Sequence, residues 1–144
     1  MILFTEIKKA IRDEARDNAD FISQNIQLES YLLKIEKYAM FHSVIAHNSL
    51  CGFVAFYAND LNEFQGFITM VHVSPKLRGK GIAKILINST CETMKALGMK
   101  SCALEVLGSN SNAVNLYKSL EFEIVEDKSN CNVLYMTKKL EKEA

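Results

Sequence analysis

The sequence of 144 residues contains one proline, six glycines and no tryptophan. It has no internal repeat, no low-complexity segment and no proline in residues 1–40, so its composition excludes a fibrous or disordered chain. No run approaches the roughly 20 apolar residues that a membrane-spanning helix needs. The apolar start gives way at once to Thr5, Glu6 and Lys8, which makes it too short for a secretory signal. We therefore expect a cytoplasmic protein without membrane contact.

Cysteine patterns that bind metals or form disulfide frameworks are also missing. Cys51, Cys91, Cys102 and Cys131 are widely spaced, with no C-x-x-C pair, and the three histidines do not lie near them at metal-ligand spacing. Four buried and reduced thiols are the expected outcome in a cytoplasmic chain. The sequence thus predicts no metal site.

The charges balance, which limits the partners that the surface can attract. Lys and Arg number 17, as do Asp and Glu, so no wide basic surface for nucleic acid is expected. Hydrophobic residues make up 49% and charged residues 24% of the chain, as in an ordinary globular domain. A chain of this length can bury about 70% of its unfolded surface in one core. We therefore predict a single domain over residues 1–144.

Hydrophobic periodicity predicts an α/β chain with a mixed sheet. Residues 1–40 are typical of one or two helices covering a sheet edge, with Asp20 as the N-cap of the second. Three strands joined by short turns then form an antiparallel meander, and a helix leads to a fourth strand that runs parallel to the third. The elements expected after residue 40 are strands at 43–46, 50–57 and 64–73, a helix at 82–97, a strand at 101–106, a helix at 112–120, and strands at 123–125 and 133–137. The apolar face predicted for helix 82–97 contains Ile82, Ile85, Leu86, Thr90, Met94 and Leu97.

The loop after Pro75 is basic and contains Gly79 and Gly81 just before the helix. The first turn of a helix offers backbone N–H groups without intrahelical partners, together with the positive end of the helix dipole. A glycine lets a phosphate approach the backbone closely. The pattern favours a phosphate site, with a simple turn and solvated charges as the alternative, and its spacing matches neither the Walker A loop nor the Rossmann glycines. The basic side chains are Lys76, Arg78, Lys80 and Lys84.

Residues 67–84 resemble the acetyl-CoA-binding motif of the GCN5-related N-acetyltransferase (GNAT) superfamily, whose pattern is [QR]-x-x-G-x-[GA]. Arg78, Gly81 and Ala83 stand at its defining positions. The resemblance covers about residues 41–137. Other family members begin with a strand, for which only Met1–Phe4 is present here.

A second stretch extends this resemblance. Leu104-Glu105-Val106, the segment from Ser109 to Tyr117, and Leu120-Glu121-Phe122 are together similar to the family pattern L-E-V, S-N-x-x-A-[IV]-x-L-Y and L-G-F. The chain departs from this pattern at Glu121, where the family usually has glycine.

The resemblance implies the GNAT fold, in which helices flank a mixed sheet and two parallel central strands splay apart to admit acetyl-CoA. The third strand is then implied to contact the pantetheine and acetyl groups, the basic loop the pyrophosphate, and Asn110 the amide arm. For the lone histidine of that strand, a core or rim position is the alternative reading. The positions implied to bind acetyl-CoA are Val71, His72, Val73, Arg78, Gly79, Lys80, Gly81, Ile82, Ala83, Lys84, Asn110 and Tyr117.

Two side chains are candidates for catalysis. When an amine attacks a thioester, the departing thiolate needs a proton, and a tyrosine with a pKa of about 10 can donate it at neutral pH. Tyr117 matches the tyrosine to which the family gives this role, and packing of its ring against the sheet is the alternative. The attacking amine must lose a proton, and Glu105 is the best candidate base. A structural or substrate-orienting Glu105, or a chain of waters as base, stays open.

The sequence therefore predicts an acetyl-CoA-dependent N-acetyltransferase that acts by direct transfer to a primary amine in a ternary complex. No cysteine lies in the motif loop, although Cys102 on the next strand leaves a covalent route open. One alternative is a non-catalytic module that binds or senses CoA, and another is an unrelated phosphate-binding α/β protein. The acceptor amine and the oligomeric state, including a homodimer, are not determined by the sequence.

Overall fold

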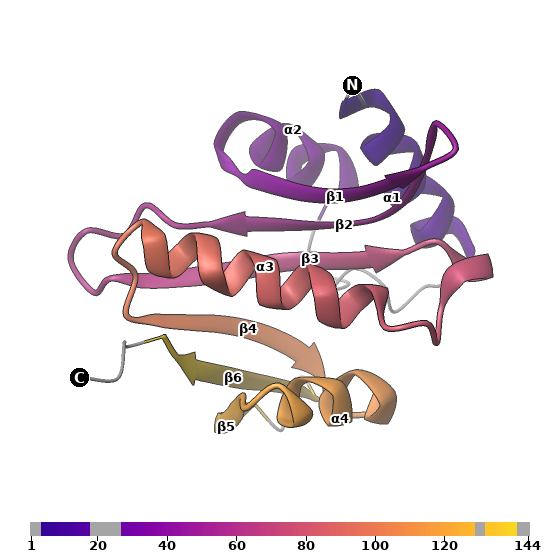
Figure 1. Ribbon diagram of the computed structural model, residues 1–144. Helices are drawn as coiled ribbons and strands as arrows, with labels where there is room; N and C mark the ends of the chain where they lie inside the picture. Colours follow the sequence, from indigo (N-terminus) through magenta and orange to yellow (C-terminus); the bar gives the residue numbers. More distant parts are fainter. Residues whose placement is uncertain (1–3, 18–26, 129–131, 141–144) are drawn as a thin grey trace.

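The computed structural model describes residues 4–17, 27–128 and 132–140 (Figure 1). Two helices precede a sheet that contains two further helices in its connections. The helices are α1 (Phe4–Asp17), α2 (Leu28–Tyr38), the 3-10 turn η1 (Pro75–Leu77), α3 (Ile82–Ala96) and α4 (Ser111–Ser119). The strands are β1 (Met40–Ala46), β2 (Ser49–Tyr57), β3 (Gln65–Val73), β4 (Ser101–Leu107), β5 (Glu123–Lys128) and β6 (Val133–Lys139).

The six strands form one sheet in the order β1-β2-β3-β4-β6-β5. β3 and β4 run parallel and are joined through α3, whereas each other neighbouring pair in the described chain is antiparallel. The predicted meander and the parallel crossover are confirmed. Every strand and helix expected after residue 40 is present, with ends within three residues of the prediction.

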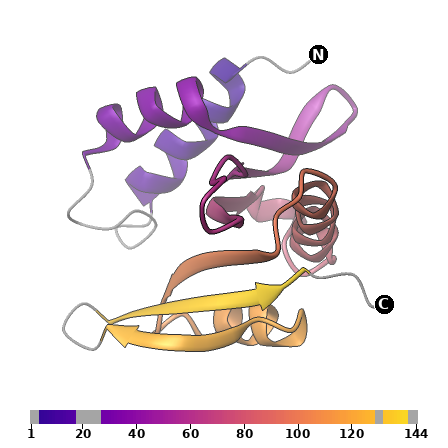
Figure 2. The same ribbon diagram turned by 90° about the vertical axis from the view of Figure 1, so that its left-hand side faces the viewer.

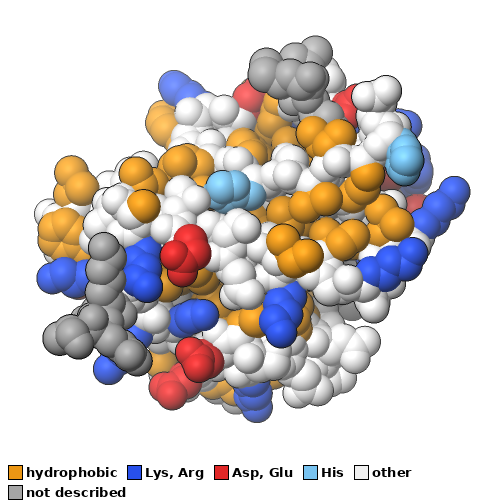
Figure 3. Space-filling model, in the orientation of Figure 1, with side chains coloured by type: hydrophobic (Ala, Val, Ile, Leu, Met, Phe, Trp, Pro, Cys, Tyr) orange, Lys and Arg blue, Asp and Glu red, His pale blue; other side chains and the backbone are white. Residues whose placement is uncertain are grey.

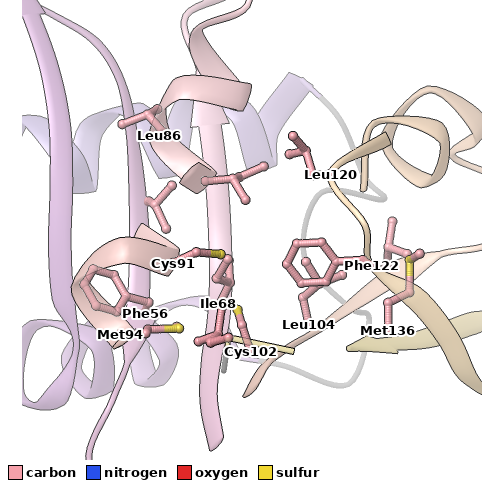
Figure 4. Packing of buried hydrophobic residues seen from close by; sticks show 14 of the residues in the cluster. Phe56, Ile68, Leu86, Cys91, Met94, Cys102, Leu104, Leu120, Phe122 and Met136 are labelled. Carbon is pink, nitrogen blue, oxygen red and sulfur yellow. The ribbon is translucent and has the colours of Figure 1, made fainter. Parts of the chain in front are cut away.

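The helices lie on both faces of the sheet, with α1 and α2 on one side and α3 on the other (Figure 2). On the α3 side, Leu86, Met94 and Phe56 pack with Leu104 and Phe122, which come from β4 and from the segment after α4 (Figure 4). On the opposite side, α1 and α2 bury Ile11, Leu32 and Ile35 against Phe53, Ala55 and Met70. Burial of such side chains is worth about 1.5–3 kcal/mol each, so both helical layers contribute to stability.

The N-terminal third differs from the prediction in two respects. α1 and α2 cover a face of the sheet instead of its edge, because their apolar stripes pack on the inward side chains of β2 and β3. Phe4 belongs to α1 and packs edge-on against Phe41 at 5.3 Å, so it does not contribute to an opening strand. The predicted N-cap Asp20 lies outside the described residues.

The predicted apolar face of α3 was wrong at two positions. Ile85 is 59% exposed and Leu97 is 48% exposed, whereas Ile87 and Cys91 are buried. Each residue of an α-helix is rotated by about 100° from the previous one. Ile85 therefore points away from the stripe that contains Ile82 and Leu86, and Leu97 stands beyond the last helical residue.

Candidate active site

The parallel strands β3 and β4 pair over four residues and then separate. Their register runs from Gln65 opposite Ser101 to Ile68 opposite Leu104 and ends there, although both strands continue for several residues. β3 remains paired with β2 on its other edge as far as Val73. The β3 edge over residues 69–73 therefore faces β4 without ladder pairing in the described chain, as the predicted splay requires.

A bulge in β3 lies at the point of separation. Phe56 of β2 pairs with Ile68 and the neighbouring Ala55 pairs with Met70, so Thr69 is one extra residue in β3. Before the bulge Ile68 faces α3, and after it Met70 faces α1 and α2. A bulge bends and twists its strand, and this one accounts for the direction in which β3 leaves β4.

The glycine loop leads from the end of β3 into α3. Gly79 and Gly81 both have φ of +81°, a left-handed conformation that favours glycine, and a Cβ at either residue would meet no atom within 4 Å. Gly81 is the N-cap of α3 and provides no side chain to bond the first-turn N–H groups. Open backbone at a helix N-terminus fits the phosphate site predicted from the sequence. Ile82 and Ala83, also predicted to contact the cofactor, form the first turn of this helix.

The basic side chains of this loop have different surroundings. Lys76, Lys80 and Lys84 are exposed, and Lys and Arg side chains are visible at the end of the molecule where η1 and α3 begin (Figure 3). The Nε atom of Arg78 donates to the Val73 carbonyl at 3.0 Å, and its Nη2 atom pairs with the Glu14 carboxylate at 2.5 Å. The side chain of Arg78 thus joins the loop to α1 and β3.

The predicted cofactor positions on β3 alternate between its two faces. Val71 packs against the core on the α3 side. His72 is buried on the other face, where its ring lies 5.6 Å from that of Phe53. Burial lowers the pKa of His72, opposed by the nearby Glu14 carboxylate. Val71 and Val73 belong to the part of β3 beyond its last pairing with β4, whereas the His72 side chain is directed toward α1.

Tyr117 lies on the α3 side of the sheet. Its ring packs edge-on against Phe122 at 5.9 Å and against the core cluster that includes Cys102, Leu104 and Val106. α4, which carries Tyr117, begins just after β4 ends beside the splay (Figure 1). Burial raises the pKa of Tyr117 to about 12. The phenol is therefore protonated throughout the neutral range, as a proton donor must be.

Glu105 lies on the opposite face of β4 from Tyr117. Its neighbours Leu104 and Val106 face the core with Tyr117, so the alternation of the strand directs the exposed Glu105 to the other side. There it pairs in register with Tyr135 of β6, whose hydroxyl donates to Gln65 Oε1 at 2.7 Å. The two catalytic candidates thus flank β4 from its two faces, one on each side of the splay.

Asn110 and Cys102 have local partners. The Asn110 side chain accepts a hydrogen bond from Ala113 N at 3.2 Å and so caps α4. Cys102 is fully buried, and its contact with Cys91 together with burial raises the pKa of its thiol. A buried thiol with a raised pKa is a poor nucleophile, which argues against Cys102 as a nucleophile. Cys51, Cys91 and Cys102 are buried free thiols as predicted, and Cys131 lies outside the described residues.

A hollow of about 480 Å³ lies between α1 and the end of β3. Its lining includes His72, Ser74 and four acidic residues of α1, but neither Glu105 nor Tyr117. Sequence reasoning did not detect this hollow, because it depends on how α1 packs on the sheet. The Glu14–Arg78 ion pair was not predicted either, because it joins residues 64 positions apart and depends on the same packing of α1.

The described part of the chain has no group of three or more His, Cys, Asp or Glu side chains that could hold a metal ion. Among the same residues, no helix combines the length and apolarity needed to cross a membrane.

Residues 5–122 match the model of the acetyltransferase (GNAT) family. The chain belongs to this family. The resemblance noted in the sequence is confirmed, and with it the mixed α/β fold. A curated relative is the Escherichia coli protein named uncharacterized N-acetyltransferase YjgM, which is 37% identical over 73 residues, or 51% of this chain and 41% of that protein. The chain thus matches less than half the length of this relative.

Solved structures of N-acetyltransferases share the fold at low sequence identity. The PaiA N-acetyltransferase of Thermoplasma acidophilum, in complex with coenzyme A, has a TM-score of 0.73 and 19% identity over 94% of this chain and 92% of its own. An N-acetyltransferase from Staphylococcus aureus has a TM-score of 0.76 and 16% identity over 96% and 93%.

Proposed function

We propose that this GNAT protein is an N-acetyltransferase that transfers the acetyl group of acetyl-CoA to a primary amine by direct attack in a ternary complex. The observation that carries the proposal is the separation of β3 and β4 after Ile68 and Leu104, next to the open glycine backbone at the start of α3. Acetyl-CoA has an extended pantetheine arm, which the free strand edge can bind, and a pyrophosphate, which the glycine backbone can bind.

Successive parts of the site can be assigned to successive parts of acetyl-CoA. The N–H groups that open α3, with Gly79, Gly81 and the exposed lysines, would hold the pyrophosphate. The backbone of β3 from Thr69 to Val73 would pair with the amide arm, because that edge faces away from β2. When bound, acetyl-CoA supplies an activated acyl group on a thiol leaving group.

Tyr117 is the proposed general acid. Its phenol is protonated at neutral pH because burial raises its pKa to about 12, and α4 places it beside the end of β4 on the α3 side. The role assigned to it is to give a proton to the departing thiolate. General acid catalysis of this kind contributes roughly 10²–10⁴-fold to a rate.

Glu105 is the proposed general base. It lies on the face of β4 opposite Tyr117, so an amine that approaches from the α1 and α2 side meets a carboxylate while the leaving group meets a phenol. An amine with a pKa of about 10.4 is mostly protonated at pH 7 and must lose a proton before it attacks. A primary amine is therefore the acceptor class that this arrangement serves, either as a small molecule or at a peptide or protein.

The proposal is tested by thiol release from acetyl-CoA against a panel of small amines, amino sugars and peptides, with mass spectrometry of the products. Acceptor-dependent release together with an acetylated amine is the expected result. Binding of CoA without release for any acceptor would instead support a non-catalytic CoA-binding module. If CoA fails to raise the melting temperature, both forms of the proposal are wrong.

A further inference from the structure

Tyr31 of α2 contacts the bulge of β3 through two hydrogen bonds. Its hydroxyl lies 3.2 Å from the carbonyl oxygen of Thr69 and 2.9 Å from Thr69 Oγ1. One arrangement satisfies both contacts: the phenol donates to the carbonyl and accepts from the threonine hydroxyl. A single side chain thereby bonds both the backbone and the side chain of the extra residue.

Thr69 lies at the point where β3 stops pairing with β4, so these hydrogen bonds act on the start of the splay. The residue follows directly on Ile68, the last β3 residue that pairs with β4, and it is the first residue of the edge that faces the splay. A bulged residue is left out of the regular ladder. In this protein the Thr69 carbonyl is bonded by a side chain from the helical layer, so the bend has a support outside the sheet.

The helix that carries Tyr31 is fixed against the sheet. Leu32 and Ile35 of the same helix are 2% and 0% exposed, so α2 is anchored in the core on that side of the sheet. Arg12 of α1 bonds both oxygens of Glu29, at 3.3 and 3.0 Å, near the start of α2. Burial raises the pKa of Tyr31 to about 12, so the phenol keeps the proton that it donates to Thr69.

We propose that Tyr31 is a positioning residue for acetyl transfer, which holds the Thr69 bulge at the point where β3 departs from β4. The bulge sets the direction of β3 residues 69–73, and through them the place of the acetyl group between Glu105 and Tyr117. This inference rests on the proposed acetyl transfer. It gives α2 a role in aligning the reacting groups, because the Tyr31 hydroxyl joins this helix to the bulge.

The test compares the wild type with Tyr31→Phe, which removes the hydroxyl and keeps the ring. Misplacement of reacting groups by about 1 Å can cost about a hundredfold in rate, and we expect kcat to fall about tenfold or more. The dissociation constant of CoA should rise less than kcat falls, because the glycine loop that holds the pyrophosphate is left intact and only the β3 edge proposed to pair with the amide arm is shifted. The control is Thr90→Val, which removes another buried hydroxyl bond to a carbonyl, Leu86 O at 2.9 Å in α3, away from the splay.

A purely structural role for Tyr31 would lower the melting temperature as in Thr90→Val and leave kcat within twofold of the wild type well below that temperature, which overturns the inference. Amide hydrogen exchange gives a second readout that needs no activity. Residues 69–73 should exchange faster in Tyr31→Phe than in Thr90→Val, and equal exchange contradicts the proposal. A wild type that transfers no acetyl group defeats the proposed function, while the exchange comparison still decides whether Tyr31 holds the bulge.

Thr69→Val provides an independent variant, and it carries the test if Tyr31→Phe does not fold. It removes the threonine hydroxyl but keeps the carbonyl bond, so we expect a smaller fall in kcat than for Tyr31→Phe. The double variant should be no slower than Tyr31→Phe alone, because both changes act on one contact. Additive effects, or a Thr69→Val enzyme with unchanged kcat and unchanged exchange, would contradict a role through Thr69.

Discussion

Tyr117 and Glu105 lie on opposite faces of one strand, and this separation makes their roles distinguishable. Tyr117 is packed among apolar side chains and pressed against Phe122. Glu105 is exposed beside Tyr135. A change at either residue can therefore be made without disturbing the surroundings of the other.

Tyr117→Phe should lower kcat by about tenfold or more, because the phenol donates the proton to the leaving thiolate. The ring and its contact with Phe122 remain, so the folded structure and the affinity for CoA should be kept. Steady-state kinetics of thiol release, with calorimetric titration of CoA, checks both statements. A variant as fast as the wild type would remove Tyr117 from the mechanism.

Glu105→Gln should also lower kcat by about tenfold or more, since an amide cannot accept the proton of the amine. The matched control is Glu126→Gln, because Glu126 of β5 is likewise exposed and stands opposite Tyr135 from the other side. The loss should be smaller at high pH, where more of the amine is already unprotonated. Equal effects of the two substitutions would point to general electrostatics in place of base catalysis.

At the scale of the element, the start of α3 is defined by backbone and not by side chains. Gly81 caps the helix in a left-handed conformation with open space around its Cα. Gly98, at the other end of the same helix, has φ of +90° and equally open surroundings. Gly81 and Gly98 thus have similar left-handed conformations at opposite ends of α3, and only Gly81 lies beside the splay.

Gly81→Ala and Gly98→Ala should each cost about 1–2 kcal/mol of stability, because L-residues are strained in the left-handed region. Only Gly81→Ala should weaken acetyl-CoA binding. A lost charge-assisted hydrogen bond is worth about 1.5–3 kcal/mol, which corresponds to about tenfold or more in the dissociation constant. Titration of CoA into both variants makes the comparison, and equal affinities would locate the pyrophosphate elsewhere.

The elements were predictable from sequence because their signals are local. Helical spacing in α3, the glycine that follows it and the turns between strands each arise within a few neighbouring residues. The bulge at Thr69 was not predictable, because Phe67 to Val73 is mostly apolar and has no regular alternation of polar and apolar residues that a bulge could interrupt. The Tyr31 contact joins residues 38 positions apart, so no local pattern reveals it.

At the scale of the whole molecule, two buried phenols link stability to alkaline pH. Burial raises the pKa values of Tyr31 and Tyr117 from 10.0 to about 12. Between these values the unfolded chain releases protons that the folded protein retains. Their contribution to stability is therefore complete below about pH 10 and is lost as the pH rises toward about 12.

The free energy of unfolding should accordingly fall between pH 10 and pH 12, the two ends of the pKa shift. Tyr117→Phe should make this fall less steep, since it removes one of the ionising groups. Tyr38→Phe, which alters a tyrosine that is 56% exposed, should leave the slope unchanged. Urea unfolding at a series of alkaline pH values measures these slopes, and identical slopes in all three proteins would contradict the linkage.

The position of β6 has a consequence for synthesis of the protein. It is the most C-terminal of the described strands, yet it lies inside the sheet between β4 and β5. While the ribosome still encloses residues 133–139, β5 has no neighbour and β4 presents an open edge to the cell. The sheet can close only after β6 emerges, so its central pairing forms later than the pairing of β1 to β4. Until then, the growing chain needs protection against pairing with other chains along β4.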